Sequence, residues 1–462
     1  MKKFLLTLLF ITLSVACFAV QEDKEEIVVR LETEVPLMPL YLGAVASENA
    51  GFDAAYLKQL EKVLEFDLDH NGMTVIAKRS SQRDALSTFD NLGNASQWRT
   101  QQIYYVVLTK VKERKLSTRV LAVNNNAIKS LEAVPLTGDL SKDRRTLHQL
   151  ADTIHKALFG SDGIASTRVL YTVRTKSPSA NKWTSDVWEA DYDGGNPRKV
   201  TEKAGYCVTP VYVPPKPGHA AGSFLYVSYL NGQPKIFYAS LKDGDNGRRM
   251  TLMRGNQLMP AMSQKRNMMA FVSDATGNPD LFILPLDADS GPTDQPRQIF
   301  AAHNAVQGTP TFSPDGKQVA FVSNKDGSAR VYTMAIPAPG ARLKDLKPKL
   351  ISKQTRESTA PSWSPDGNKL AYCSLTNGVR QIWMHDFEKG TERQLTQGPG
   401  NKENPTWAPN SLHLMFNSTG TNASELYLIN LNQPKATKIA INAGEKHYPC
   451  WEIKSSDRMQ SY

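Results

Sequence analysis

Beyond its first 19 residues, this sequence of 462 residues contains no apolar run that approaches the length of a membrane span, about 20 residues. It contains no Gly-x-Ser-x-Gly motif, the nucleophile-bearing turn of α/β hydrolases. None of its eight histidines stands in a His-Glu-x-x-His arrangement. The acidic pair Asp67 and Asp69 falls at a predicted helix end, where a solvated face is expected. The sequence therefore predicts a soluble, exported protein that is not an enzyme and binds no metal or cofactor.

A segregated basic surface is also lacking, although the formal net charge is +10. Lysine and arginine are spread through predicted turns and strand ends with acidic neighbours, and no stripe of basic and aromatic residues appears. Nucleic acid is therefore not a predicted partner. We interpret the charge as a source of solubility and of a preference for acidic surfaces.

The N-terminus has the pattern of a secretory signal. Met1-Lys2-Lys3 is basic, and residues 4–19 form a short apolar run that ends in small residues. Cleavage is expected after Ala16 or Ala19. Two alternatives are disfavoured: a transmembrane anchor needs a longer span, and a lipid-modified Cys17 would normally follow a Leu where this chain has Ser14.

A strand-turn-strand unit recurs through the last two thirds of the chain. Its clearest copy is 359–367, Thr-Ala-Pro-Ser-Trp-Ser-Pro-Asp-Gly, followed by an apolar strand at 369–374. Pro, Asp and Gly in this order favour a tight turn. The copies are spaced by 44 to 51 residues, and their first prolines are Pro210, Pro260, Pro310, Pro361, Pro405 and Pro449. This period is within the range of propeller blades.

Aromatic residues keep the same phase as the prolines. Eleven residues after the second to fifth proline stand Phe271, Phe321, Tyr372 and Phe416, and eleven further on stand Phe282, Tyr332, Trp383 and Tyr427. Each unit ends in a fourth short run, so six units of four strands predict a six-bladed β-propeller. The first unit begins with a run that matches the second strand of a blade, and the last unit ends with a run that matches the first strand. The two chain ends are therefore predicted to complete one blade between them, which removes the open sheet edges.

The remaining residues predict a small α/β domain before the ring. Asp53 is expected to cap a helix that Asn71-Gly72 ends, and Ser141 to cap a second helix that ends at Gly160. Strands are expected at 27–31, 74–77, 103–108, 118–123 and 129–136. The predicted divisions are a signal peptide at 1–19, an N-terminal α/β domain at 20–160, a linker at 161–167, a six-bladed β-propeller at 168–453 and a C-terminal tail at 454–462.

Three cysteines remain once Cys17 is removed, and an odd number cannot all pair within one chain. Cys373 lies in an apolar strand and is predicted to be a buried free thiol. Cys207 and Cys450 fall on equivalent strands of neighbouring blades. A bridge between them is conceivable, but two buried thiols are favoured.

Nearly the whole mature chain resembles the TolB family of periplasmic propeller proteins. The resemblance is carried by 94–99, Asn-Ala-Ser-Gln-Trp-Arg, by the linker through 166–173 and by the Pro-x-Trp/Phe-Ser-Pro-Asp-Gly repeats. It implies a periplasmic component of the Tol-Pal system whose propeller binds the peptidoglycan-associated lipoprotein Pal. It also implies that the segment before the first strand, from about Val20 to Glu25, contacts the inner-membrane protein TolA. That segment is short and acidic here, which departs from the family pattern.

The propeller fold predicts where a partner binds. The loop before each proline strand and the loop between the second and third strands emerge on the same face, beside the channel. A polar ring there suits a folded partner or an inserted peptide, although a solvated loop residue is the alternative for each member. His303 and Arg356 are the strongest candidates. The predicted partner-binding residues are Arg254, Gln257, His303, Arg356, Glu357, Lys402, Glu403 and His447.

The recurrent aromatic residues Phe312, Trp363, Trp407 and Trp451 are instead expected to pack between blades. The predicted function is that of a noncatalytic adaptor in the periplasm. It would bind Pal through the propeller face and a TolA-type protein through the N-terminal region, for outer-membrane integrity and envelope constriction at cell division. The alternative is a periplasmic propeller that binds a small ligand or acts as a hydrolase.

Overall fold

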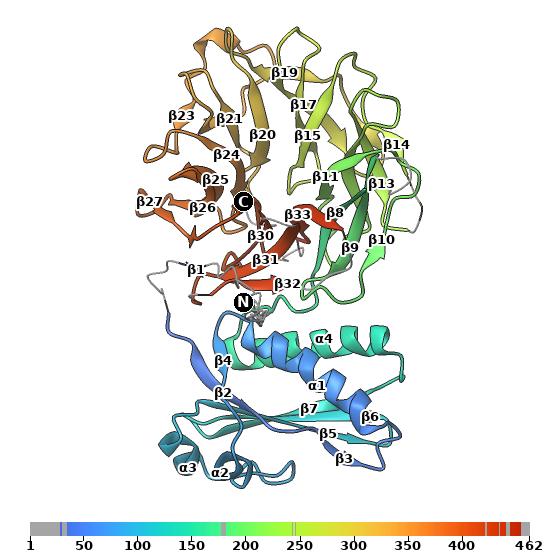
Figure 1. The fold of residues 1–462 in the computed structure, drawn as a ribbon, viewed down its shortest axis with the longest axis vertical. Coiled ribbons are helices and arrows are strands. Elements are labelled where there is room, and N and C mark those ends of the chain that lie inside the picture. Colours follow the sequence, from blue (N-terminus) through green and yellow to red (C-terminus); the bar gives the residue numbers. More distant parts are fainter. Residues whose placement is uncertain are drawn as a thin grey trace, which may run out of the picture.

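The computed structural model describes residues 28–29, 35–176, 182–242, 244, 246–420, 423–433, 435–439 and 444–453. Figure 1 shows an α/β domain beneath a ring of β-sheets, and this confirms the predicted fold class. The predicted signal peptide, the segment 20–25 and the C-terminal tail lie outside the described residues. None of the helices in the described part combines the length and the apolar character of a membrane span.

The α/β domain is built on one mixed sheet with the order β4-β2-β5-β6-β7, and β3 pairs with β5. The strands β2 and β4 run parallel to each other, as do β2 and β5, while β5, β6 and β7 form an antiparallel meander. The strands are β2 Met38–Leu42, β3 Ala46–Glu48, β4 Thr74–Ile76, β5 Tyr105–Lys112, β6 Lys115–Ala122 and β7 Ala127–Pro135. The helices are α1 Ala54–Asp69, α2 Ser81–Asp84, α3 Ala95–Thr100 and α4 Leu140–Phe159.

The two long helices begin where side chains satisfy their free N–H groups. Asp53 accepts a hydrogen bond from Tyr56 N, as predicted for α1. The cap of α4 is Asp139 rather than the predicted Ser141, because the Asp139 carboxylate accepts from the N–H groups of Ser141 and Lys142. Gly160 ends α4 with a φ of 73°, as expected. Both helices lie between the sheet and the propeller in Figure 1.

Six blades form the propeller (Figure 1). Listed from the innermost strand outward, the first blade has β11 Cys207–Tyr212, β12 Ser223–Ser228, β13 Lys235–Ser240 and β14 Arg248–Arg249, and the second has β15 Gln257–Met262, β16 Met268–Ser273 and β17 Asp280–Asp287, with β18 Gly291–Pro292 and β19 Arg297–Phe300. The third blade has β20 Gln307–Phe312, β21 Gln318–Ser323, β22 Arg330–Ala335 and β23 Lys349–Leu350, and the fourth has β24 Ser358–Trp363, β25 Lys369–Thr376, β26 Val379–Asp386 and β27 Thr391–Gln394. The fifth blade has β29 Asn401–Trp407, β30 His413–Thr419, β31 Ser424–Asn430 and β32 Thr437–Ile439, and the last has β33 Glu445–Trp451, β8 Arg168–Lys176, β9 Trp183–Asp191 and β10 Arg198–Lys199. A short 3₁₀ helix, Leu343–Asp345, lies between β22 and β23.

The last blade closes the ring as predicted. Its strand order is β10-β9-β8-β33, so the last described strand of the chain pairs with the first strand of the propeller. Trp451 is 1% exposed and its Nε1 donates to Thr167 Oγ1 at 2.8 Å. The buried indole of Trp451 therefore connects the last strand of the propeller to Thr167, the residue directly before its first strand.

Each innermost strand also contains an irregularity that the sequence did not predict. The register shifts at the repeated proline, and the residue directly before that proline has a positive φ. Non-glycine residues rarely adopt this conformation. The six residues are Thr209, Met259, Thr309, Ala360, Asn404 and Tyr448, with φ between 35° and 54°. Together with the prolines they line a central channel with a volume of about 230 Å³.

The two domains share one hydrophobic core. The cluster that contains Leu60 of α1 and Ile154 of α4 continues into the propeller through Tyr192 and Trp451. Hydrogen bonds also cross the boundary, from Asn432 Nδ2 to Gly72 O at 3.0 Å and from Gln433 Nε2 to Asp69 O at 2.9 Å. A two-residue strand, β1 Val28–Val29, pairs with β28 Thr396–Gln397 at the propeller.

Cys207, Cys373 and Cys450 are free thiols. Cys207 and Cys373 are buried, and Cys450 is half-buried. The favoured prediction of unpaired thiols is confirmed, and the bridge between Cys207 and Cys450 is not formed.

Candidate functional site

One face of the propeller carries the predicted partner-binding residues. We call it the loop face: the loops between the second and third strands and the loops that lead into each innermost strand. The strand β9 has Trp183 at this face and Asp191 at its other end, beside α1 and α4. Eight residue steps of about 3.3 Å each place the two ends roughly 26 Å apart. The loop face and the domain boundary are therefore at opposite ends of the same strand.

Six of the eight predicted residues are accessible on this face. Arg254, His303 and Arg356 are exposed, and Glu357, Glu403 and His447 are half-buried. The exposed residues lie in the loops that enter β15, β20 and β24, so the six do not form one continuous group. The structure brings Glu357 and Glu403 together around a shared arginine and places His447 in the last blade.

Gln257 and Lys402 were predicted in exposed loops, and this placement is wrong. Both side chains are 0% exposed. Gln257 Nε2 donates to Met253 O at 2.8 Å, and Lys402 Nζ donates to Gly398 O at 2.7 Å. Both residues stand three positions before a repeated proline. Their side chains turn inward and donate hydrogen bonds to the backbone of the preceding loop. We therefore remove them from the candidate site.

Two arginines that the sequence analysis did not single out organise the face. Arg380 Nη2 lies 2.7 Å from Glu357 Oε1, and its Nε lies 3.6 Å from Glu403 Oε1. Arg174 Nε donates to Glu445 Oε2 at 2.7 Å. Arg380 thus bridges two carboxylates at the start of neighbouring innermost strands, and Arg174 pairs with the carboxylate at the start of β33.

Aromatic side chains surround the second arginine. The Arg174 guanidinium lies 4.3 Å from the ring centroid of Trp183, and the rings of Tyr206 and Tyr229 are 6.2 Å apart. Tyr448, the residue before the last repeated proline, lines the channel below them. We call this group the mouth patch: Arg174, Trp183, Tyr206, Tyr229, Glu357, Arg380, Glu403, Glu445, His447 and Tyr448.

Burial sets the charge states at the centre of the mouth patch. It lowers the pKa of His447, an effect that the neighbouring Glu445 carboxylate only partly offsets. Burial likewise raises the pKa of Tyr448, and Tyr206 and Glu403 add to this shift. Both groups are therefore neutral near pH 7, and the charges of the patch come from its arginines and glutamates.

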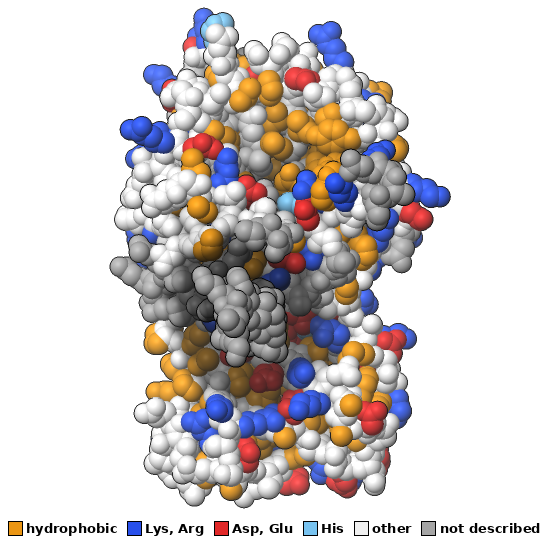
Figure 2. Space-filling view, in the orientation of Figure 1, with side chains coloured by type: hydrophobic (Ala, Val, Ile, Leu, Met, Phe, Trp, Pro, Cys, Tyr) orange, Lys and Arg blue, Asp and Glu red, His pale blue; other side chains and the backbone are white. Residues whose placement is uncertain are grey.

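Large apolar side chains add to this face. Among the described residues, nine large hydrophobic side chains are exposed, and six of them stand at loops of this face: Trp183, Tyr229, Leu230, Leu252, Val306 and Leu375. Leu252 is 90% exposed. On the side of the molecule drawn in Figure 2, hydrophobic side chains gather over the propeller around β11, β15 and β17, and charged side chains are scattered over the α/β domain. Exposed apolar groups next to fixed charges are typical of protein interaction sites.

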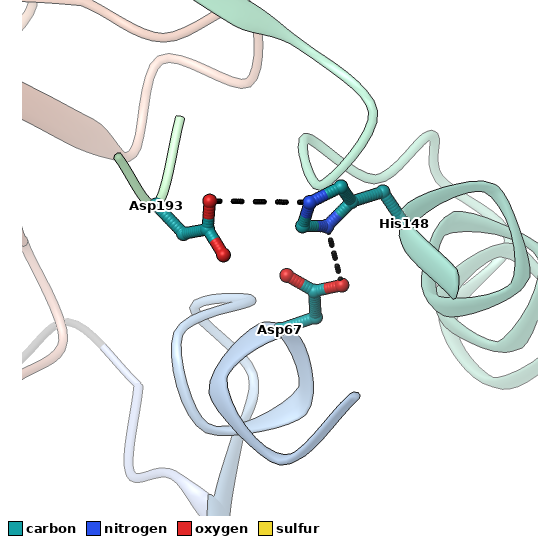
Figure 3. A group of neighbouring side chains, drawn as sticks. All are labelled: Asp67, His148 and Asp193. Atoms are coloured by element: carbon teal, nitrogen blue, oxygen red, sulfur yellow. Dashed lines mark hydrogen bonds and ion pairs between the residues drawn. The ribbon is translucent and has the colours of Figure 1, made fainter. Parts of the chain in front are cut away.

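A second polar cluster lies at the domain boundary (Figure 3). His148 Nδ1 lies 2.8 Å from Asp67 Oδ2, and Tyr192 Oη donates to Asp67 Oδ1 at 2.9 Å. Asp67 is 1% exposed, so the prediction that it lies on a solvated helix end is wrong. Arg144 of α4 pairs with Asp193. This cluster joins α1 and α4 to the loop that follows β9.

Electrostatics in this cluster favour the protonated, charged form of His148. Burial alone would lower the pKa of His148, but the carboxylates of Asp67, Asp191 and Asp193 outweigh it and raise the pKa. Burial also raises the pKa of Asp67, and the attraction of His148 partly opposes that shift. Asp67, His148 and Asp193 are close enough together to bind a metal ion, which histidine spacing in the sequence did not indicate.

Comparisons with known proteins agree with this architecture. The family model described as TolB beta propeller domain matches residues 155–454. The chain is 54% identical over 391 residues to a TolB homolog from Protochlamydia amoebophila, across 84% of this chain and 83% of that protein. It is 41% identical over 289 residues to a TolB homolog from Chlamydia pneumoniae, across 62% of this chain and 64% of that protein.

Among solved structures, the chain is similar to the crystal structure of TolB from Acinetobacter baumannii. The TM-score is 0.72, and the match covers 93% of this chain and 100% of that one. The sequence identity is 21%, so this likeness supports the fold and not the details of the site.

Proposed function

The chain belongs to the TolB family, and from this premise we propose that it is a noncatalytic periplasmic adaptor of the Tol-Pal envelope system. In this proposal the loop face binds Pal, the peptidoglycan-associated lipoprotein. The N-terminal region contacts a TolA-type inner-membrane protein, and together these contacts serve outer-membrane integrity and constriction at cell division.

The mouth patch is the observation that carries the proposal. Arginine, tyrosine and tryptophan dominate the binding energy of protein interfaces, and here Arg174, Arg380, Trp183 and three tyrosines share one area. The Arg380–Glu357 pair fixes the guanidinium while leaving the side chains 28% and 38% exposed. A partner can therefore bury a group whose orientation is already set, which limits the entropy lost on binding.

The channel does not favour the alternative of a small ligand or a hydrolytic reaction. Its volume of about 230 Å³ is below the range of about 300–1,000 Å³ typical of ligand pockets. The described residues that line it are proline, aliphatic, aromatic, hydroxyl and amide residues with one cysteine, and none of them carries an acidic or basic side chain. The described part of that wall thus provides no histidine, carboxylate or lysine as a general acid or base for hydrolysis.

The start of the chain bears on the second partner. The backbone of β1 pairs with β28, which places Val28 and Val29 at the propeller, a few positions along the chain from the segment that the family resemblance gives to a TolA-type protein. A partner that draws β1 away from the propeller as an extended strand has to replace the two residue pairs between β1 and β28. The acidic segment 21–26 lies outside the described residues and remains a predicted contact.

Affinity capture from envelope extract with the mature chain, residues 20–462, tests the Pal assignment. We expect recovery of a peptidoglycan-associated lipoprotein from the organism's own envelope. Recovery should fall at least tenfold for Arg380→Glu, and also for the double variant His303→Ala with Arg356→Glu. Arg342→Glu is the matched control, because Arg342 is exposed in the loop between the third and fourth strands of its blade, away from the loop face.

Two results would overturn the proposal. One is the absence of any lipoprotein from the captured material when the chain is shown to be folded. The other is equal recovery by all three variants, which would remove the loop face from the account. Thermal stabilisation by a metabolite without any protein partner would support the small-ligand alternative instead.

A further inference from the structure

The domain boundary concentrates negative charge in a buried place. Asp67 comes from α1, and Asp191 and Asp193 come from the end of β9 and the loop after it. Asp67 and Asp191 are 1% and 6% exposed, and the side chain of Asp193 is 7% exposed. Arg144 of α4 supplies one positive charge against these three carboxylates. Three buried carboxylates against one arginine leave a negative excess that a further positive charge, either a proton on His148 or a bound cation, has to offset.

His148 points from α4 into the middle of this group (Figure 3). Its Nδ1 is fixed by Asp67 at 2.8 Å, so its Nε2 faces the propeller. Nε2 lies 3.6 Å from Asp191 Oδ2 and 3.9 Å from Asp193 Oδ1. These separations exceed the about 2.7–3.2 Å of a hydrogen bond. Accordingly, Nε2 has no hydrogen-bond partner among the described residues, although the residue is 2% exposed.

We propose that His148, Asp191 and Asp193 bind a divalent transition-metal ion of the zinc type at the domain boundary, with Asp67 orienting the imidazole. Zinc binds histidine nitrogen and carboxylate oxygen at about 2.0–2.2 Å. Two ligand atoms of one tetrahedral ion therefore lie roughly 3.3–3.6 Å apart. The separations of 3.6 Å and 3.9 Å between His148 Nε2 and the two aspartates are close to this range.

The neighbours of these residues orient them for such an ion. Metal-binding histidines commonly donate their second ring N–H to a carboxylate, and Asp67 provides that acceptor. Gly195 N donates to Asp193 Oδ1 at 2.9 Å, and Asn196 Nδ2 donates to Asp191 Oδ2 at 2.7 Å. Both propeller carboxylates are thus held in place, and each retains further lone pairs.

Charge balance favours a divalent ion over a proton. With His148 neutral, the three carboxylates and Arg144 sum to −2, which one divalent cation neutralises. A proton on His148 leaves the same group at −1. The mixture of imidazole and carboxylate suits zinc and similar transition metals, whereas calcium and magnesium prefer sets of oxygen ligands.

The ion would tie the α/β domain to the propeller. His148 belongs to α4 and the two aspartates belong to the last blade, so the three ligands are together only when the domains are docked. Metal binding should therefore stabilise the docked arrangement, and above the dissociation constant this stabilisation should grow with the logarithm of the free metal concentration. Three protein ligands leave one position for water in a tetrahedral geometry.

Titration of the chelator-treated mature chain with Co²⁺ and Zn²⁺ tests the proposal. We expect one equivalent of Co²⁺ to produce the intense visible absorption of a tetrahedral complex, and Zn²⁺ to displace it. His148→Gln and Asp193→Asn should weaken binding at least tenfold. His219→Gln should bind as the parent chain does, because His219 is an exposed histidine on the propeller. Tenfold excesses of Ca²⁺ and Mg²⁺ should not compete.

The proposal is overturned if no stoichiometric binding occurs, or if His148→Gln binds as tightly as the parent chain. If that variant fails to fold, X-ray absorption of the zinc-loaded parent chain decides the matter. One imidazole with the remaining ligands oxygen supports the site. Two or more imidazoles, or any sulfur, contradict it.

Discussion

The domain boundary and the mouth patch are both built from arginine and carboxylate side chains, but they differ in burial. At the boundary, the Arg144 and Asp193 side chains are 18% and 7% exposed. In the mouth patch, the Arg380 and Glu357 side chains are 28% and 38% exposed. The same chemistry therefore serves two purposes, because water reaches one group and largely not the other.

Burial determines what breaking each network costs. Removing one partner of a buried ion pair leaves an uncompensated charge and costs several kcal/mol. Removing one partner of an exposed pair costs about 0–1 kcal/mol, since water solvates the remaining charge. The boundary should therefore control stability, and the mouth patch should control binding.

The largest effect is expected from Asp67→Ala. This change leaves His148 and Tyr192 without their shared acceptor, so the free energy of unfolding should fall by about 3–5 kcal/mol. Urea denaturation in chelator-containing buffer measures it.

Glu65→Ala, an exposed position on the same helix, is the matched control and should change stability by less than about 0.5 kcal/mol. Equal midpoints for the two variants would contradict the structural role of the boundary cluster.

A pair of glycines compares the two regions directly. Gly72 at the boundary and Gly232 on the loop face have φ values of 86° and 83°, so alanine strains both backbones equally. A Cβ at Gly72 would lie 2.4 Å from Leu412 Cδ2, whereas nothing lies within 4 Å at Gly232. Gly72→Ala should therefore cost about 1–3 kcal/mol more than Gly232→Ala. Thermal unfolding of both variants checks this, and equal losses would show that the boundary is loosely packed.

Acid should weaken the boundary through His413, whose ring lies beside Gly72: a Cβ at Gly72 would be 2.9 Å from His413 Cε1. Burial lowers the pKa of this histidine to about 3, below the unfolded value of about 6.5. The unfolded chain therefore binds a proton first as pH falls, and stability is lost between about pH 6.5 and pH 3. From pH 7.5 to pH 5 this loss is roughly 2 kcal/mol.

Urea midpoints across this pH range measure the effect. His413→Gln should flatten the pH dependence, and His219→Gln should leave it unchanged. A parallel curve for His413→Gln would rule out this histidine as the source.

The smallest effect on stability is expected from Arg380→Ala in the mouth patch. Its carboxylate partners remain accessible to water, so the free energy of unfolding should fall by no more than about 1 kcal/mol. The same variant should bind Pal at least tenfold more weakly in calorimetry, because arginine is a common hot spot. A large loss of stability with unchanged affinity would reverse the assignment of the two regions.

The repeats made most of the fold predictable. Prolines and aromatic residues at fixed spacing indicate the strands of each blade, and the order of the first and last units indicates the closure through β33 and β8. The positive φ before each proline was not predictable, because the six positions hold five different residue types and no glycine. The cap of α4 was misplaced for a local reason: Asp139 and Ser141 are both good caps, and only the backbone decides between them.

The sites were harder to predict than the fold. Gln257 and Lys402 look like polar loop residues in the sequence, and only the packed structure shows them turned inward. Arg174 and Arg380 could have been found, since they stand at the loops between second and third strands that the fold reasoning had already placed on the same face. The boundary cluster had no local signal, because Asp67, His148 and Asp193 come from three distant segments.

Hydrogen–deuterium exchange of the mature chain with and without Pal tests the central claim most directly. The account predicts slower exchange on binding in the loop-face segments 204–208, 229–234, 375–381 and 445–448. It predicts no change in the boundary segments 191–196 and 431–437. Protection confined to the boundary segments, with the loop face unaffected, would contradict it.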